Sequence, residues 1–60
     1  MHNYQFKYYY RKTENGEKIF DYGFITSKDP DIINACEIAM LQQATKKGWF
    51  SCCLVYAKEY

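Results

Sequence analysis

The segment Glu14-Asn15-Gly16 separates two stretches of alternating aromatic and polar residues, and it constrains the fold more than any other feature. Such alternation is typical of a β-strand with one apolar face, and Asn-Gly between two strands indicates a hairpin. We therefore predict a β-hairpin made of residues 4–11 and 18–26. The aromatic residues of a single parity are Tyr4, Phe6, Tyr8 and Tyr10 in the first strand, and Phe20, Tyr22 and Phe24 in the second.

The length of the hairpin loop decides how these two aromatic faces combine. A two-residue loop at Asn15-Gly16 divides the rings between both faces of the hairpin. A three-residue loop, Glu14-Asn15-Gly16, collects them on one face, and Gly16 then supplies the left-handed residue that such loops use. A slip of one residue turns a whole strand over, so burial of the rings favours the three-residue loop. The predicted pairs are Tyr10 with Phe20, Tyr8 with Tyr22, and Phe6 with Phe24.

A helix is predicted to follow the hairpin. In Asp29-Pro30-Asp31, the Asp29 side chain can cap the helix and Pro30 suits the first helical position. Gly48 ends the helix, and Lys46 and Lys47 precede it at the negative end of the helix dipole. The apolar stripe consists mostly of small residues, which fit closely against large rings on a sheet. Its members are Ile32, Ile33, Ala35, Cys36, Ala39, Met40 and Ala44.

Residues 49–57 are predicted to form a last strand that is apolar on both sides, with Phe50, Cys52, Leu54 and Tyr56 facing the core. A strand of this kind is usually covered on both sides, whereas one helix covers only one side of a sheet. The predicted fold is a single α+β domain, residues 1–60, with order β-β-α-β and a mostly antiparallel three-stranded sheet. The helix packs on its aromatic face. We prefer a last strand beside the first; a parallel position beside the second is the alternative.

The length and composition of the chain argue against some classes of function. With 60 residues and a net charge of +1, the chain has neither the size for a large pocket nor the charge imbalance of a strongly basic nucleic-acid binder. Its three cysteines are an odd number, and adjacent Cys52 and Cys53 diverge in a strand, so reduced thiols are expected. The chain shows no targeting or membrane-spanning pattern. We expect a complete cytoplasmic protein.

No set of residues indicates catalysis or metal binding. His2 has no partner in metal-ligand spacing, and Cys52-Cys53 lacks the Cys-x-x-Cys spacing of zinc and redox sites. Cys36 and Cys52 are interpreted as small apolar core groups, which leaves Cys53 as the one candidate reactive thiol. We therefore expect no enzyme, metal or cofactor.

The leading functional hypothesis is a small non-enzymatic module that binds a protein and forms a homodimer. Its size and tyrosine content are typical of small bacterial and phage products, so an accessory protein of phage or prophage type that binds a host protein is one interpretation. The apolar excess of the last strand supports an interface on the open sheet face or on the back of the helix. The candidate interface residues are Ile38, Leu41, Ile19, Ile25, Cys53 and Val55.

The alternative hypothesis is a small nucleic-acid-binding module. Tyr9 lies between Lys7 and Arg11 on one side of the first strand, and single-stranded nucleic acid stacks on such basic and aromatic surfaces. Sheet-based RNA-binding domains use two or three exposed rings, whereas the predicted register exposes only Tyr9. The candidate residues are Lys7, Tyr9, Arg11, Lys12 and Lys18. No resemblance is specific enough to name a family.

Overall fold

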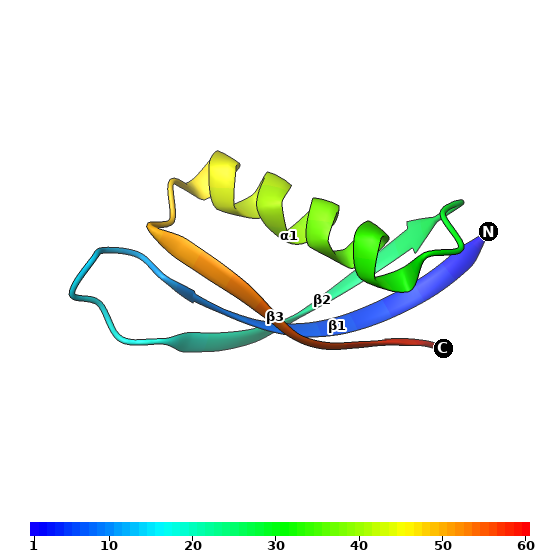
Figure 1. Ribbon diagram of the computed structural model, residues 1–60, viewed down its shortest axis with the longest axis horizontal. Helices are drawn as coiled ribbons and strands as arrows, with labels where there is room; N and C mark the ends of the chain where they lie inside the picture. Colours follow the sequence, from blue (N-terminus) through cyan, green and yellow to red (C-terminus); the bar gives the residue numbers. More distant parts are fainter.

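The computed structural model describes residues 1–60 and contains three strands and one helix. They are β1 (His2–Arg11), β2 (Ile19–Ser27), α1 (Ile32–Lys47) and β3 (Ser51–Glu59). The sheet order is β2-β1-β3, and β1 pairs antiparallel with both neighbours. Figure 1 shows α1 along one side of the twisted sheet, with both termini at the same end. The predicted β-β-α-β fold and the preferred strand order are confirmed.

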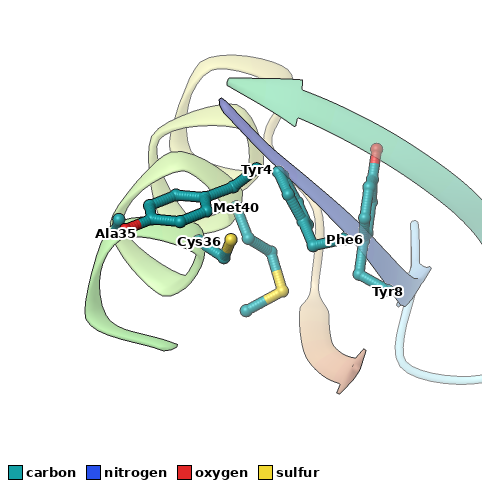
Figure 2. Close-up of a cluster of buried hydrophobic side chains, with 6 residues drawn as sticks. All are labelled: Tyr4, Phe6, Tyr8, Ala35, Cys36 and Met40. Carbon is teal, nitrogen blue, oxygen red and sulfur yellow. The ribbon is translucent and has the colours of Figure 1, made fainter. Parts of the chain in front are cut away.

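The core lies between the central strand and the helix. Tyr4, Phe6 and Tyr8 project from β1 toward α1, where they meet Ala35, Cys36 and Met40 (Figure 2). Large residues on the sheet thus face mostly small ones on the helix, as the sequence predicts. The buried Tyr4 hydroxyl donates to the Asp29 carbonyl at 2.7 Å, so this polar group has a partner. Trp49 extends the core by stacking on Tyr10 at 3.8 Å between ring centroids.

The predicted register of the hairpin is wrong by one residue. The structure pairs Phe6 with Gly23, Tyr8 with Asp21, and Tyr10 with Ile19. The turn closes with a bond from the Gly16 N–H to the Thr13 carbonyl at 3.0 Å, and Gly16 does not adopt a left-handed conformation. The aromatic residues of β2 therefore lie on the opposite side of the sheet from those of β1.

The reason for this register lies at Gly23. A Cβ atom on Gly23 would lie 2.2 Å from Cζ of Phe6, so the Phe6 ring occupies the space of the missing side chain. In the predicted register the Phe6 ring would face the Phe24 ring, and one helix would have to cover two rows of rings. When Phe6 packs on Gly23, the core contains a single row of rings, those of β1, and α1 covers it.

A β-bulge changes the predicted faces of β3. Tyr8 pairs with Leu54 while Lys7 pairs with Tyr56, so the register shifts at Val55. As a result Cys52, Leu54 and Ala57 pack toward the core, and Tyr56 turns to the opposite side. The prediction that Tyr56 faces the core is therefore wrong, because an extra residue reverses the alternation after Val55. The prediction for Phe50 is also wrong: Phe50 lies before the first residue of β3, and its ring contacts Arg11.

The helix boundaries are confirmed at the end and corrected at the start. Gly48 is the C-cap with φ 69°, and Lys46 and Lys47 occupy the last turn. At the start, Asp31 rather than Asp29 is the N-cap, and its carboxylate accepts the Asn34 N–H at 3.1 Å. Asp29 instead accepts the Asp31 N–H at 2.9 Å and the Asn34 side-chain amide at 2.7 Å. The sequence therefore predicts one capping aspartate, whereas in the structure Asp31 caps the helix and Asp29 holds the residues around the cap.

Candidate ligand-binding face of the sheet

The side of the sheet turned away from α1 is uncovered (Figure 1). Its residues alternate with the buried residues of β1 and are paired with one another across the strands. We call this surface the open face. It consists of Gln5, Lys7, Tyr9 and Arg11 from β1, Phe20, Tyr22 and Phe24 from β2, and Cys53, Tyr56 and Lys58 from β3, bordered by Lys18, Phe50 and Tyr60.

Seven aromatic side chains gather on and around the open face. Tyr9 is half-buried, and the exposed fractions of the other six lie between 42% for Tyr56 and 64% for Tyr60. Neighbouring rings are in contact, since the centroids of Tyr9 and Phe20 are 5.6 Å apart and those of Phe24 and Tyr60 are 5.9 Å apart. Contiguous exposed apolar surface on a soluble domain marks an interaction site.

The charges of the chain are segregated between the two sides of the sheet. Lys7, Arg11, Lys18 and Lys58 lie on the open face, which carries no acidic side chain. The seven acidic residues lie on the α1 side or in the hairpin loop: Asp21, Asp29, Asp31, Glu37, Glu59, Glu14 and Glu17. The net charge of the chain is only +1, but the charged side chains of the open face are all positive.

Three of the four cations rest on the rings of this face. The Lys7 ammonium lies 5.4 Å from the Phe20 centroid and 5.7 Å from that of Tyr22. Lys18 lies 4.8 Å from the Tyr9 ring, and the guanidinium of Arg11 lies 5.4 Å from the Phe50 ring. Cations within about 6 Å of a ring centroid are attracted by its electron-rich face. The long side chains are therefore held down along the sheet.

The pKa values of two phenols of the open face, Tyr9 and Tyr56, are raised. A hydrogen bond with the Cys53 thiol raises the pKa of Tyr9. Burial, followed by the neighbouring Tyr22 hydroxyl, raises the pKa of Tyr56. These phenols stay protonated near neutral pH and keep their hydrogen-bond donors. The face thus combines aromatic rings, phenol hydrogen-bond donors and positive charges.

A charged side chain, Asp21, on the outer edge strand β2 opposes pairing with a further strand. The Asp21 carboxylate accepts the Tyr22 N–H at 2.8 Å on this edge strand. Charged side chains on edge strands block the addition of a further strand. The face, rather than this edge, is the surface available to a ligand.

The residues of the predicted protein interface are distributed over three places. Ile19 and Ile25, expected on the open face, pair with Tyr10 and Tyr4 and lie on the α1 side, because the register differs by one residue. Cys53 is on the open face beside Tyr9, and Val55 is exposed at the bulge. Ile38 and Leu41 lie on the outer surface of α1, with exposed fractions of 48% and 52%. These six residues do not form one continuous surface.

The predicted nucleic-acid-binding residues are brought together with one exception. Lys7, Tyr9, Arg11 and Lys18 share the open face. Lys12 instead lines a depression with Trp49 and Lys47 on the α1 side of the sheet. The sequence reasoning missed the rings of β2, Lys58 and the bulge-turned Tyr56. Gly23 in the middle of a strand was the available signal, because a strand glycine often marks a close approach by another group.

Comparisons with known protein families, with curated proteins and with solved structures found no match to this chain. No helix of the structure combines the length and the apolar character needed to cross a membrane. No three His, Cys, Asp or Glu side chains converge in a way that holds a metal ion.

Proposed function

We propose that this chain is a non-enzymatic binding module whose open face binds single-stranded nucleic acid. The observation that carries the proposal is the combination, on one face, of seven rings and four cations with no acidic side chain. Each base of a single strand has a flat surface that stacks on an aromatic ring, and each phosphate pairs with a cation. Sheet-based RNA-binding domains use two or three such rings.

The same charges argue against a homodimer formed by two open faces. Pairing this face with its own copy would bring four cations against four cations, and like charges across an interface oppose association. An anionic ligand has the opposite effect, since its phosphates neutralise the cations as the rings become covered. The charge of the face therefore favours nucleic acid over a second copy of the chain at this site.

The first test is fluorescence anisotropy with a labelled single strand of mixed sequence and about 20 nucleotides, longer than the site of one small domain. Four phosphate contacts predict a slope of log K against log salt of about −3, because each contact on a single strand contributes about −0.7. We expect binding at about 50 mM salt that is greatly weakened at about 200 mM. Absence of binding at the lower salt concentration contradicts the proposal.

Matched variants separate the open face from the rest of the surface. Lys58→Ala removes a cation from the open face and lowers the magnitude of the salt slope by about 0.7, whereas Lys47→Ala removes the same charge from the end of α1 and leaves the slope unchanged. Phe24→Ala weakens binding about 5- to 160-fold, as expected for one lost stacking contact. Equal effects of Lys58→Ala and Lys47→Ala would place the ligand elsewhere.

Self-association through the helix is the second candidate function. Ile38 and Leu41 line a shallow apolar depression on the outer surface of α1, together with Gln42, Thr45 and Lys46. Sedimentation over a concentration series tests it: Leu41→Asp is expected to leave a folded monomer, whereas Phe24→Ala leaves the dimer intact. A wild-type chain that is monomeric at every concentration rules this candidate out.

A further inference from the structure

A cleft of about 370 Å³ lies between α1 and the part of the sheet formed by β1 and β2. Its volume is near the lower end of the range of small-molecule sites, about 300–1,000 Å³. Phe6, Tyr8 and Met40 line the cleft, and all three are buried residues of the core. The cleft therefore reaches the core of the domain from the α1 side of the sheet.

The sequences of β2 and α1 explain why this space is open. Gly23 has no side chain above the sheet, and the Phe6 ring that lies there instead lines the cleft, next to Ile25. On the other side, four helix residues at positions i, i+3, i+4 and i+7 share one face of α1. They are Ala39, Gln42, Gln43 and Lys46. The wall on the sheet is thus mostly apolar, and the wall on the helix is mostly polar.

The hydroxyl of Tyr8, unlike that of Tyr4, has no hydrogen-bond partner in the chain. The Tyr4 hydroxyl donates to the Asp29 carbonyl, whereas no hydrogen bond joins the Tyr8 hydroxyl to another residue. Tyr8 is only 5% exposed and packs beside Phe6, as Figure 2 shows. Because no side-chain oxygen is buried without a partner, the Tyr8 hydroxyl reaches the surface, and the cleft is the only hollow that Tyr8 lines. Tyr8 therefore presents a free hydrogen-bonding group to the cleft.

The charge and the donors of the cleft suit a negatively charged acceptor. Lys46 is the only charged side chain that lines it, and the amides of Gln42 and Gln43 add further donors. Burial, and then the charge of Asp21, raises the pKa of Tyr8, so its phenol stays protonated near neutral pH and can donate. Asp21 pairs with Tyr8 across the strands but does not line the cleft. A carboxylate on an apolar body matches both walls.

We propose that the cleft binds a small apolar carboxylate. Its hydrocarbon part lies against Phe6, Ile25 and Met40, and its carboxylate accepts hydrogen bonds from the Tyr8 hydroxyl and the Lys46 ammonium. The cleft has room for about twelve groups the size of a water molecule, at about 30 Å³ each. Octanoate fits within this limit and is the probe for the test. The site lies on the α1 side of the sheet and is independent of the open face and its proposed function.

Methyl NMR of the full chain locates the ligand. Ile25 and Met40 line the cleft, whereas Ile38 lines the depression on the outer surface of α1, which Lys46 also borders. Millimolar octanoate is expected to give saturable shifts of the Ile25 and Met40 methyl signals and none of the Ile38 signals. Octanol, which has the same chain without the charge, is expected to bind about 10-fold more weakly, because hydrogen bonds to a charged group are lost.

Three results of this titration overturn the inference. The first is the absence of a saturable shift at Ile25 and Met40. The second is a shift that is largest at Ile38, which places the ligand on the outer surface of α1. The third is octanol binding as tight as that of octanoate, because the cleft then does not recognise a carboxylate.

Two tyrosine variants test the hydroxyl. Tyr8→Phe is expected to weaken octanoate binding about 10-fold and to leave the melting temperature of the free protein unchanged, since this hydroxyl has no partner to lose. Tyr4→Phe is expected to lower the melting temperature, because the Asp29 carbonyl loses its donor, and to leave octanoate binding unchanged. If Tyr8→Phe binds octanoate as tightly as the wild type, the inference is overturned.

Three lysine variants test the charge. Lys46→Gln is expected to weaken octanoate binding about 2- to 5-fold, as for a partly exposed ion pair, and to leave octanol binding unchanged. Lys47→Gln removes the same charge from the next residue, which does not line the cleft, and is expected to leave octanoate binding unchanged. Lys58→Ala, which tests the open face, is also expected to have no effect on octanoate. Equal effects of Lys46→Gln and Lys47→Gln would contradict a carboxylate site at Lys46.

Discussion

Replacing Gly23 by alanine tests the packing that determines the register of the sheet. The new Cβ would lie 2.2 Å, 2.6 Å and 2.8 Å from three carbons at the end of the Phe6 ring. Carbon atoms in favourable contact are about 3.5–4.0 Å apart, so the ring or the strand must move by more than about 1 Å. Phe6 is only 4% exposed, and such a movement disturbs the core.

The cost of this overpacking is about 1–3 kcal/mol in the free energy of unfolding. A domain of this size has a total stability of only about 3–9 kcal/mol. The melting temperature is therefore expected to fall by about 5–20 °C. Thermal and urea denaturation followed by circular dichroism measure the change.

The sign of the stability change caused by Gly23→Ala distinguishes the observed register from the predicted one. If the hairpin had the register that collects all rings on one side, Gly23 would face solvent. Alanine there would then stabilise the strand by about 0.5–1 kcal/mol, because glycine is unfavourable in a strand interior. A Gly23→Ala variant as stable as the wild type, or more stable, refutes the packing of Phe6 on Gly23. In a Phe6→Leu background the cost of Gly23→Ala should largely disappear, because the end of the ring is gone.

Three further predictions concern the thiols and the start of the helix. Cys53 is exposed and is expected to react first with a thiol reagent in the native state, the half-buried Cys52 more slowly, and the buried Cys36 only on unfolding, because burial raises the pKa of the Cys36 and Cys52 thiols; equal rates for all three contradict this. Asp31→Ala removes the N-cap and should lower stability by about 1 kcal/mol in urea denaturation, with no change expected if the cap is redundant. Hydrogen bonds from the Asn34 side chain and the Asp31 backbone lower the pKa of Asp29, so its contribution is present above its unfolded pKa of about 4 and is lost as pH falls through the lower folded value. An Asp29→Asn variant should therefore show a flatter dependence of stability on pH in acid, and an unchanged curve would exclude this contribution.

Much of the fold can be predicted from the sequence because the deciding signals are local. Alternating rings indicate the first two strands, and Asn15-Gly16 indicates the turn between them. Gly48 and the two preceding lysines mark the end of the helix, and the structure confirms them as C-cap and last turn. The small residues of α1 also indicate its packing against aromatic side chains. Each of these inferences uses residues that are neighbours in the chain.

The candidate site was predicted only in part, and for a definite physical reason. Lys7, Tyr9, Arg11 and Lys18 are correctly grouped, because three of them alternate along a single strand. The rings of β2 were assigned to the wrong side, since an alternating pattern looks the same after a shift of one residue while every side chain changes face.

Only the tertiary structure determines on which side of the sheet the aromatic side chains of each strand lie. The Phe6 ring requires the space above Gly23, and that contact joins residues on different strands. The bulge at Val55 likewise depends on pairing with β1, and it turns Tyr56 toward the open face. The sequence by itself determined which residues alternate, where the hairpin turns and where the helix ends. The packing of one ring on one glycine determined which aromatic residues form the core and which remain available to a ligand.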